Sequence, residues 1–216
     1  MTHEEYPGYV LWMTGLSGAG KTTIALLLEK ELQSRGCKFE RLDGDVVRES
    51  LTRDLGFSKE DRDKNIERVS FVAKLLSRNG VGCVCSFISP YQAVRDMVRA
   101  GTTNFMEVFI DAPLNVVMDR DVKGMYKKAI AGEIKNFTGI SDPFEAPTNP
   151  EIHIHTDQET PEESAQRILS YLEERGYIPV GARVQVGDRR RAIDLQRPQI
   201  SGRGMSTAGE TVNDCP

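Results

Sequence analysis

The chain has 216 residues, a net charge of −4 at pH 7 and 39% hydrophobic residues, which predicts one domain with its own apolar core. The interspersed charges argue against nucleic acid or an anionic membrane surface as the main partner. No apolar run approaches the ~20 residues that span a bilayer. Residues 1–6 lack the basic and apolar pattern of a signal peptide, so we expect a cytoplasmic protein.

The predicted elements alternate between strands and helices. Strand-like apolar runs occupy residues 9–14, 38–42, 81–88, 105–110 and 152–156. Helical patterns occupy residues 21–35, 59–79, 90–100, 114–120 and 161–175. This alternation predicts an α/β fold, in which helices cover both faces of a parallel sheet.

Residues 15–22, GLSGAGKT, join the first predicted strand to the first predicted helix. The spacing fits G-x-x-x-x-G-K-[ST], a loop whose backbone N–H groups bind a polyphosphate. Lys21 is expected at the β- and γ-phosphates and Thr22 on Mg²⁺; the alternative is an ordinary glycine-rich turn. The predicted ATP contacts are Gly15, Leu16, Ser17, Gly18, Ala19, Gly20, Lys21, Thr22 and Thr23.

Two carboxylates, Asp43 and Asp45, follow the second predicted strand. The carboxyl ends of parallel strands are where ligands bind in such sheets. One carboxylate could therefore approach Mg²⁺ and the other could accept a proton from an attacking hydroxyl. The third predicted strand ends without an aspartate, which leaves this pair as the expected metal-linked acids. The alternative is that Asp-Gly-Asp is only a turn.

A set of side chains suited to an aromatic anion comes next: Arg48, Phe57, Arg62 and Asn65. Guanidiniums bind oxyanions, the aromatic ring can stack on a base, and the amide can bond its edge. Each residue taken alone is more often a surface charge or a core aromatic, so the prediction rests on their combination.

Two stretches interrupt the alternation. Residues 121–150 combine four lysines with repeated Gly and Pro, and a mobile lid over charged substrates is the functional interpretation. A solvated loop with some helix is the alternative. Residues 179–216 lack apolar periodicity, so we interpret them as a disordered or non-native tail after a domain at 1–178.

The cysteines and histidines carry no predicted chemistry. Cys83 and Cys85 alternate along a predicted strand and are expected on opposite sides of the sheet, as small buried side chains; a redox pairing of Cys37 stays open. His153 and His155 share one face of the last strand and could chelate a metal. No third ligand is evident in the sequence, so surface histidines are favoured.

Several blocks occur in an order that closely resembles the adenylylsulfate kinase family over roughly residues 5–178. They are the loop at 15–22, DGDxxR at 43–48, GFSxEDRxxN at 56–65, ISPY at 88–91, KGMYKKA at 123–129, and residues 137–147. The resemblance implies a three-layer P-loop kinase fold with five parallel strands in the order 2-3-1-4-5. It also implies transfer of the γ-phosphoryl of MgATP to the 3′-hydroxyl of adenosine 5′-phosphosulfate (APS). The products are 3′-phosphoadenosine 5′-phosphosulfate (PAPS) and ADP, and the step belongs to sulfate activation.

The resemblance also assigns residues. Lys21, Asp43, Asp45 and Ser89 are the implied catalytic residues, with Asp43 orienting the 3′-hydroxyl and Asp45 near Mg²⁺, roles that could be exchanged. Phe57 and Phe144 would stack on the adenine of APS, and Arg120 would pack over ATP. Arg48, Arg62 and Lys127 would hold the phosphosulfate or ribose, with Asn65 and Ile88 in the same pocket. A homodimer and functional coupling to ATP sulfurylase are compatible with the family.

Ser89 matches a serine that is described in this family as a phosphoserine intermediate. We expect a mainly structural role, because Ser89-Pro90 fits the cap and first residue of a helix. In-line transfer also needs no covalent protein intermediate. Two other functions stay open: another small-molecule kinase acting on gluconate, shikimate or a nucleotide, and a nucleotide-dependent switch without turnover.

Overall fold

The computed structural model describes residues 5–181. The tail predicted at 179–216 therefore lies almost wholly outside the described residues and stays a prediction. Within the described part, none of the helices is long and apolar enough to cross a membrane.

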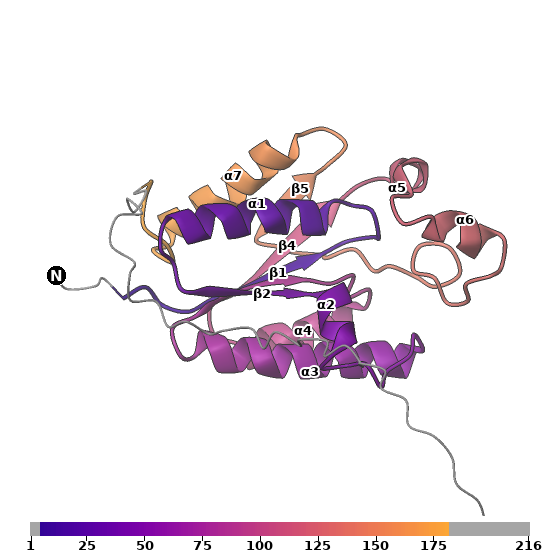
Figure 1. Ribbon diagram of the computed structural model, residues 1–216, viewed down its shortest axis with the longest axis horizontal. Helices are drawn as coiled ribbons and strands as arrows, with labels where there is room; N and C mark the ends of the chain where they lie inside the picture. The colour runs from indigo at the N-terminus through magenta and orange to yellow at the C-terminus, as the bar shows by residue number, and fades with distance from the viewer. Residues whose placement is uncertain (1–4, 182–216) are drawn as a thin grey trace, which may run out of the picture. The chain divides into compact units, whose positions relative to one another are not determined.

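One parallel sheet forms the middle layer (Figure 1). Its strands are β1 (Val10–Thr14), β2 (Phe39–Asp43), β3 (Gly82–Ser86), β4 (Phe105–Asp111) and β5 (Ile152–His155). They lie in the order β2-β3-β1-β4-β5, which confirms the predicted order. All five carboxyl ends consequently point to the same edge of the sheet, where the phosphate-binding loop begins.

Helices cover both faces of the sheet (Figure 1). One face carries α1 (Lys21–Ser34) and α7 (Pro161–Glu174); the other carries α2 (Gly44–Glu49), α3 (Lys59–Ser77) and α4 (Gln92–Gly101). Beyond the carboxyl edge lie α5 (Leu114–Arg120) and α6 (Met125–Ile130). The six-residue helices α2 and α6 were not predicted, because segments this short show little apolar periodicity.

Two apolar cores result from the alternation of side chains along buried strands. In β1, Leu11 and Met13 pack toward α1 and α7, whereas Val10 and Trp12 pack toward α3 and α4. Each fully buried aliphatic side chain contributes about 1.5–3 kcal/mol to folding. The sheet is therefore fixed from both faces, and its carboxyl edge forms a rigid base for the loops.

The expectation for two cysteines was wrong. Cys83 and Cys85 both pack in the core that contains Trp12, because residues two apart along a strand point to the same face. Both thiols are fully buried, and burial raises their pKa. Their character as small buried side chains is confirmed.

Helix caps explain where the elements begin and end. The Thr160 hydroxyl accepts from the backbone N–H of Glu163, whose carboxylate accepts from the Thr160 N–H, a capping box that starts α7. Gly36 follows α1 with a φ of 70°, the left-handed conformation that ends helices. The start expected at Pro90 was wrong, since α4 begins at Gln92.

Candidate active site

The loop between β1 and α1 depends on glycine for its path. A Cβ on Gly15 would lie 2.2 Å from the Ile110 carbonyl oxygen, so the loop passes directly against β4. Gly20, with a φ of 105°, turns the chain into α1. The free N–H groups at the start of α1 therefore face the carboxyl edge, an arrangement that fits the triphosphate of ATP.

Lys21 lies folded against this loop. Its Nζ donates to the carbonyl oxygens of Gly15 at 2.8 Å and Leu16 at 2.7 Å. Burial, helped by the nearby Lys123, lowers the pKa of Lys21 to about 7, while Asp43 and Asp45 act in the opposite direction. An anion bound in the loop would favour the charged ammonium.

Asp43 is buried beside the loop, at the end of β2. Its Oδ1 accepts from the backbone N–H of Asp45 at 3.0 Å and so caps α2. Its Oδ2 accepts from the Thr22 hydroxyl at 3.1 Å, with Arg41 3.5 Å away. The adjacent hydroxyl and carboxylate are the oxygen ligands that Mg²⁺ prefers, so these residues fit the cation.

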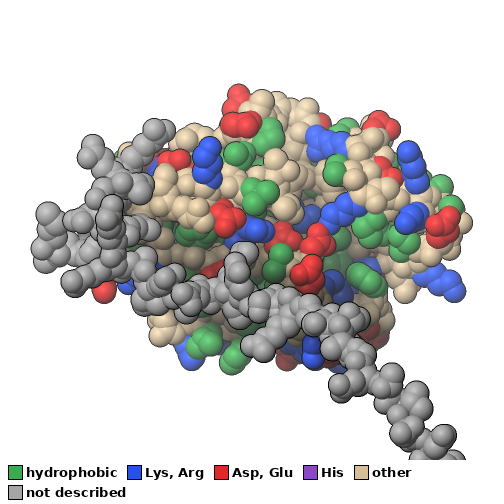
Figure 2. Space-filling view, viewed as in Figure 1, with side chains coloured by type: hydrophobic (Ala, Val, Ile, Leu, Met, Phe, Trp, Pro, Cys, Tyr) green, Lys and Arg blue, Asp and Glu red, His purple; other side chains and the backbone are tan. Residues whose placement is uncertain are grey.

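Asp45 is exposed to solvent and contacts the segment between α5 and α6. It pairs with Lys123, and both side chains are more than half exposed. Its charge also acts on the Arg48 guanidinium. Acidic and basic side chains gather in this region, between α1 and α2 in the space-filling view (Figure 2).

Arg48 and Arg62 lie close enough for their charges to interact. Burial lowers the pKa of Arg48, and Arg62 lowers it further. The Arg48 guanidinium lies 4.3 Å from the centre of the Phe57 ring, whose side chain is exposed. It also donates to the backbone oxygens of Leu55 and Gly56 at 3.3 and 3.1 Å. The structure thus brings together the guanidiniums and one aromatic ring of the predicted acceptor pocket.

Arg62 connects α3 to the return segment of the predicted lid. It donates to Thr138 Oγ1 at 2.7 Å and to Asp142 Oδ2 at 2.6 Å, and it also bonds the Asn136 carbonyl. The Tyr91 hydroxyl donates to the same Asp142 oxygen at 2.8 Å. Arg62 therefore has protein partners for much of its donor capacity.

The remaining predicted acceptor residues are less clearly assembled. Asn65 is buried, and its Oδ1 accepts from the Thr52 hydroxyl at 2.7 Å. This amide oxygen therefore has a partner inside the protein. Phe144 stacks on Phe109 with 5.9 Å between ring centres. Ile88 is half-buried, and Lys127 is exposed on α6.

Ser89 is 3% exposed and has a φ of 42°, which is unusual for a residue other than glycine. Its hydroxyl accepts from the Trp12 indole N–H at 3.0 Å. Its carbonyl oxygen accepts from Arg95 at 2.7 Å. The predicted capping role was wrong, since α4 begins three residues later, but Ser89 is integrated into the core.

Sequence reasoning missed Thr156 and Tyr126, which attach other segments to the loop. Arg120 donates to the Thr156 carbonyl oxygen at 2.6 Å, and the Thr156 hydroxyl donates to the Ala19 carbonyl oxygen at 2.8 Å. The Tyr126 hydroxyl donates to the Ser17 carbonyl oxygen at 2.9 Å. The signal for Thr156 was its place directly after the last strand, at the same edge as the loop.

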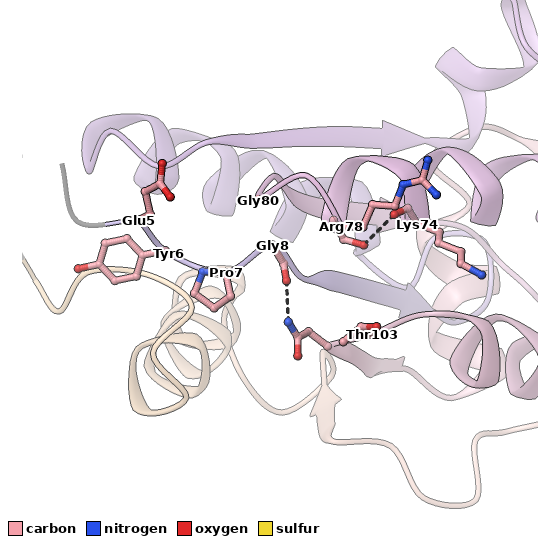
Figure 3. A pocket seen from close by; sticks show the side chains of 10 residues that line it. Glu5, Tyr6, Pro7, Gly8, Lys74, Arg78, Gly80 and Thr103 are labelled. Atoms are coloured by element: carbon pink, nitrogen blue, oxygen red, sulfur yellow. Dashed lines mark hydrogen bonds between the residues drawn. The ribbon is translucent and has the colours of Figure 1, made fainter.

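Two hollows of the described surface lie away from these residues. One, of about 690 Å³, lies near the amino ends of β1 and β4 and is lined by residues such as Pro7, Lys74 and Arg78 (Figure 3). The other, of about 750 Å³, lies over α3 and α4. Lys21, Asp43 and Asp45 line neither hollow. The candidate catalytic groups lie instead at the carboxyl edge of the sheet.

A family model described as adenylylsulphate kinase matches residues 7–155. A probable adenylyl-sulfate kinase of Pseudomonas aeruginosa is 72% identical over 165 residues, which are 76% of this chain and 77% of that protein. An adenylyl-sulfate kinase of Halothermothrix orenii is 58% identical over 180 residues, 83% of this chain and 97% of that protein.

A solved structure of a Mycobacterium tuberculosis APS kinase, in complex with AMPPNP and APS, is also similar. It aligns with a TM-score of 0.74 and 42% identity over 78% of this chain and 99% of that one. A probable bifunctional SAT/APS kinase of Sorangium cellulosum is 56% identical over 209 residues, which are 95% of this chain and 36% of that protein. The glycine loop and its carboxylates thus occur in a fold shared with kinases, and this chain belongs to the adenylylsulphate kinase family.

Proposed function

We propose that this adenylylsulphate kinase transfers the γ-phosphoryl of ATP to the 3′-hydroxyl of APS, with acceptor and donor meeting at the carboxyl edge of the sheet. The observation that carries this reading is the 3.1 Å hydrogen bond from Thr22 to Asp43, which joins the phosphate-binding loop to the acid pair. In the reaction, the 3′-oxygen bonds to the γ-phosphorus, the bond from that phosphorus to the β–γ bridging oxygen breaks, and ADP leaves.

Three groups would hold the donor nucleotide. The N–H groups at the start of α1 would bind the phosphates, and Lys21 would leave the carbonyls of Gly15 and Leu16 to bind the β- and γ-phosphates. Arg120, which already contacts Thr156 beside the loop, would cover the base or phosphates. Thr22 and Asp43 would hold Mg²⁺. Bound there, Mg²⁺ would neutralise charge that develops on the transferring phosphoryl group.

The contacts of the two aspartates support an exchange of the roles first assigned to them. Asp43 bonds Thr22, whereas Asp45 faces Arg48 and Lys123. We therefore give Asp43 the metal-linked role. Asp45 would orient the 3′-hydroxyl and accept its proton as the oxygen–phosphorus bond forms.

The acceptor pocket would lie over Arg48 and Phe57, with Arg62 and Phe144 on the side of the return segment. The aromatic rings suit a base, and the guanidiniums suit a phosphosulfate. Lys127, Ile88 and Asn65 would complete this pocket. Residues 121–150 would close over both substrates and exclude water.

An ATP-consumption assay with APS tests the assignment. Wild type should release ADP and form PAPS, and gluconate and shikimate should not stimulate ADP release. Lys21→Ala should lose activity for every acceptor. Turnover of a sugar acid in preference to APS, or ATP binding without any PAPS, would contradict the proposal.

Further expectations concern the assembly. A homodimer and functional coupling to a sulfurylase are supported by family resemblance, and the bifunctional Sorangium relative favours the second. The cytoplasmic location stays a prediction of the sequence analysis. Light scattering of the full chain and co-purification with a sulfurylase would test the first two.

A further inference from the structure

Two histidines and an aspartate gather at one edge of the sheet, on the face opposite α7. In β5, Ile152 and Ile154 are buried against the core that includes α7, so His153 and His155 share the other face. The parallel register places Asp111, the last residue of β4, beside His155. Neighbouring residues in register point to the same face, so the backbone itself brings the three side chains together.

The donor atoms are spaced for a metal ion. Asp111 Oδ2 lies 2.9 Å from His153 Nε2 and 3.7 Å from His155 Nδ1. The donor atoms of all three residues lie within 4.8 Å of one another. Ligands about 2.0–2.1 Å from a tetrahedral Zn²⁺ are roughly 3.3 Å apart, so small rotations of the rings suffice.

Neighbouring residues fix the positions of both histidines. The His153 ring stacks on the Phe109 ring with 4.8 Å between their centres. The backbone carbonyl oxygen of His153 accepts from Arg167 at 3.0 Å. The backbone N–H of His155 donates to Glu159 at 3.0 Å. Such support lowers the entropy lost when a metal orders the ligands.

We propose that Asp111, His153 and His155 form a site for a divalent transition-metal ion of the Zn²⁺ class. Two imidazoles and one carboxylate suit Zn²⁺, Ni²⁺ or Cu²⁺ and do not suit Mg²⁺, which prefers oxygen ligands. The three side chains are 33–44% exposed, which leaves the remaining coordination positions open to water. This site is separate from the Thr22–Asp43 pair and does not depend on the proposed function.

Titration of the full, nucleotide-free chain with Zn²⁺ by calorimetry tests the site. Wild type should bind one equivalent at this site. His155→Ala and Asp111→Asn should each weaken that binding at least about tenfold, or about 1.4 kcal/mol. Two matched controls should bind like wild type: His3→Ala removes the only other histidine, and Asp157→Asn removes a nearby exposed carboxylate.

Circular dichroism should show that each variant is folded, and the visible spectrum of bound Co²⁺ supplies a second readout. The Co²⁺ bands should disappear in His155→Ala and persist in His3→Ala. Failure of wild type to bind Zn²⁺ would overturn the proposal. Unchanged binding in both His155→Ala and Asp111→Asn, or loss of binding in His3→Ala, would also overturn it.

Discussion

The indole N–H of Trp12 donates to the Ser89 hydroxyl at 3.0 Å, inside the core and next to the predicted active site. Through this bond the Ser89 hydroxyl satisfies a buried donor, which is a structural role. Ser89→Ala should keep most of the turnover, because in-line transfer needs no phosphoserine. It should lower the free energy of unfolding by about 1–3 kcal/mol, since the indole donor is left unpaired. Denaturant unfolding followed by fluorescence of Trp12, the single tryptophan, measures this loss.

Ser89→Gly is the matched control for the backbone. It removes the same hydroxyl but suits the φ of 42°, so it should be about 1 kcal/mol more stable than Ser89→Ala. Loss of turnover in both variants, with native fluorescence, would instead establish a chemical role for the hydroxyl.

Asp43→Asn and Asp45→Asn should have different kinetic signatures. Asn can still cap α2, so Asp43→Asn should fold normally, but it should need more Mg²⁺ for half-maximal activity. Asp45→Asn should lower kcat about 10²–10⁴-fold with an unchanged Mg²⁺ requirement, because a proton acceptor is lost. Steady-state rates at varied Mg²⁺ separate these outcomes. The reverse pattern would restore the original assignment of the two roles.

ATP binding should be coupled to proton uptake by Lys21. With its pKa at about 7 in the free protein, the side chain is largely neutral at pH 8, and bound phosphate would recharge it. Affinity should therefore fall as pH rises above about 7. Calorimetry at pH 8 in buffers of different ionisation enthalpy measures the uptake.

Lys123→Ala provides the comparison, because Lys123 is a neighbour that lowers the Lys21 pKa. The variant should take up fewer protons at pH 8 than wild type. Equal proton uptake in wild type and Lys123→Ala would contradict this electrostatic coupling.

Arg95 should contribute strongly to stability. Its guanidinium is almost fully buried, pairs with Glu107 at 2.7 Å and also bonds the carbonyl oxygens of Ser89 and Glu145. Arg95→Met should cost about 3–5 kcal/mol, because the buried Glu107 carboxylate loses its 2.7 Å partner and keeps only the longer contact to Arg99. Arg95→Met should also raise the KM for APS. Arg95 bonds the Glu145 carbonyl oxygen, and Glu145 directly follows Phe144 of the proposed acceptor pocket.

Arg99→Met is the control for the same carboxylate. Arg99 reaches Glu107 at 3.3 Å but is 35% exposed, so its loss should cost about 1 kcal/mol. Denaturation midpoints and APS titrations measure both variants. Similar losses of stability for the two would show that burial of the pair carries little weight.

The sheet and its phosphate-binding loop could be predicted because their signals are local. Apolar runs and capping residues delimit strands and helices, and the spacing of glycines in GLSGAGKT is enough to predict a phosphate-binding loop. The tie from Arg120 to Thr156 could not be predicted, since it joins residues 36 apart in sequence through the fold. The positive φ of Ser89 could not be predicted either, because Ser-Pro fits a helix cap and first helical residue, and a capping residue normally has an extended backbone.

The metal ligands show where a simple rule would have helped. His153 and His155 were recognised as sharing a face, but their third ligand, Asp111, ends the preceding strand 42 residues earlier. Aligning the ends of adjacent parallel strands would have found it. The same period-two rule, applied to Cys83 and Cys85, would have avoided the error about their faces.

The buried guanidinium of Arg95 joins a strand, the turn at Ser89 and the end of the segment that would close over APS. Because one side chain serves all three, a substitution there would reduce both the amount of enzyme that survives cellular quality control and the rate of each surviving molecule. A growth defect caused by such an allele could therefore not be assigned to either cause until enzyme abundance and specific activity were measured in the same cells.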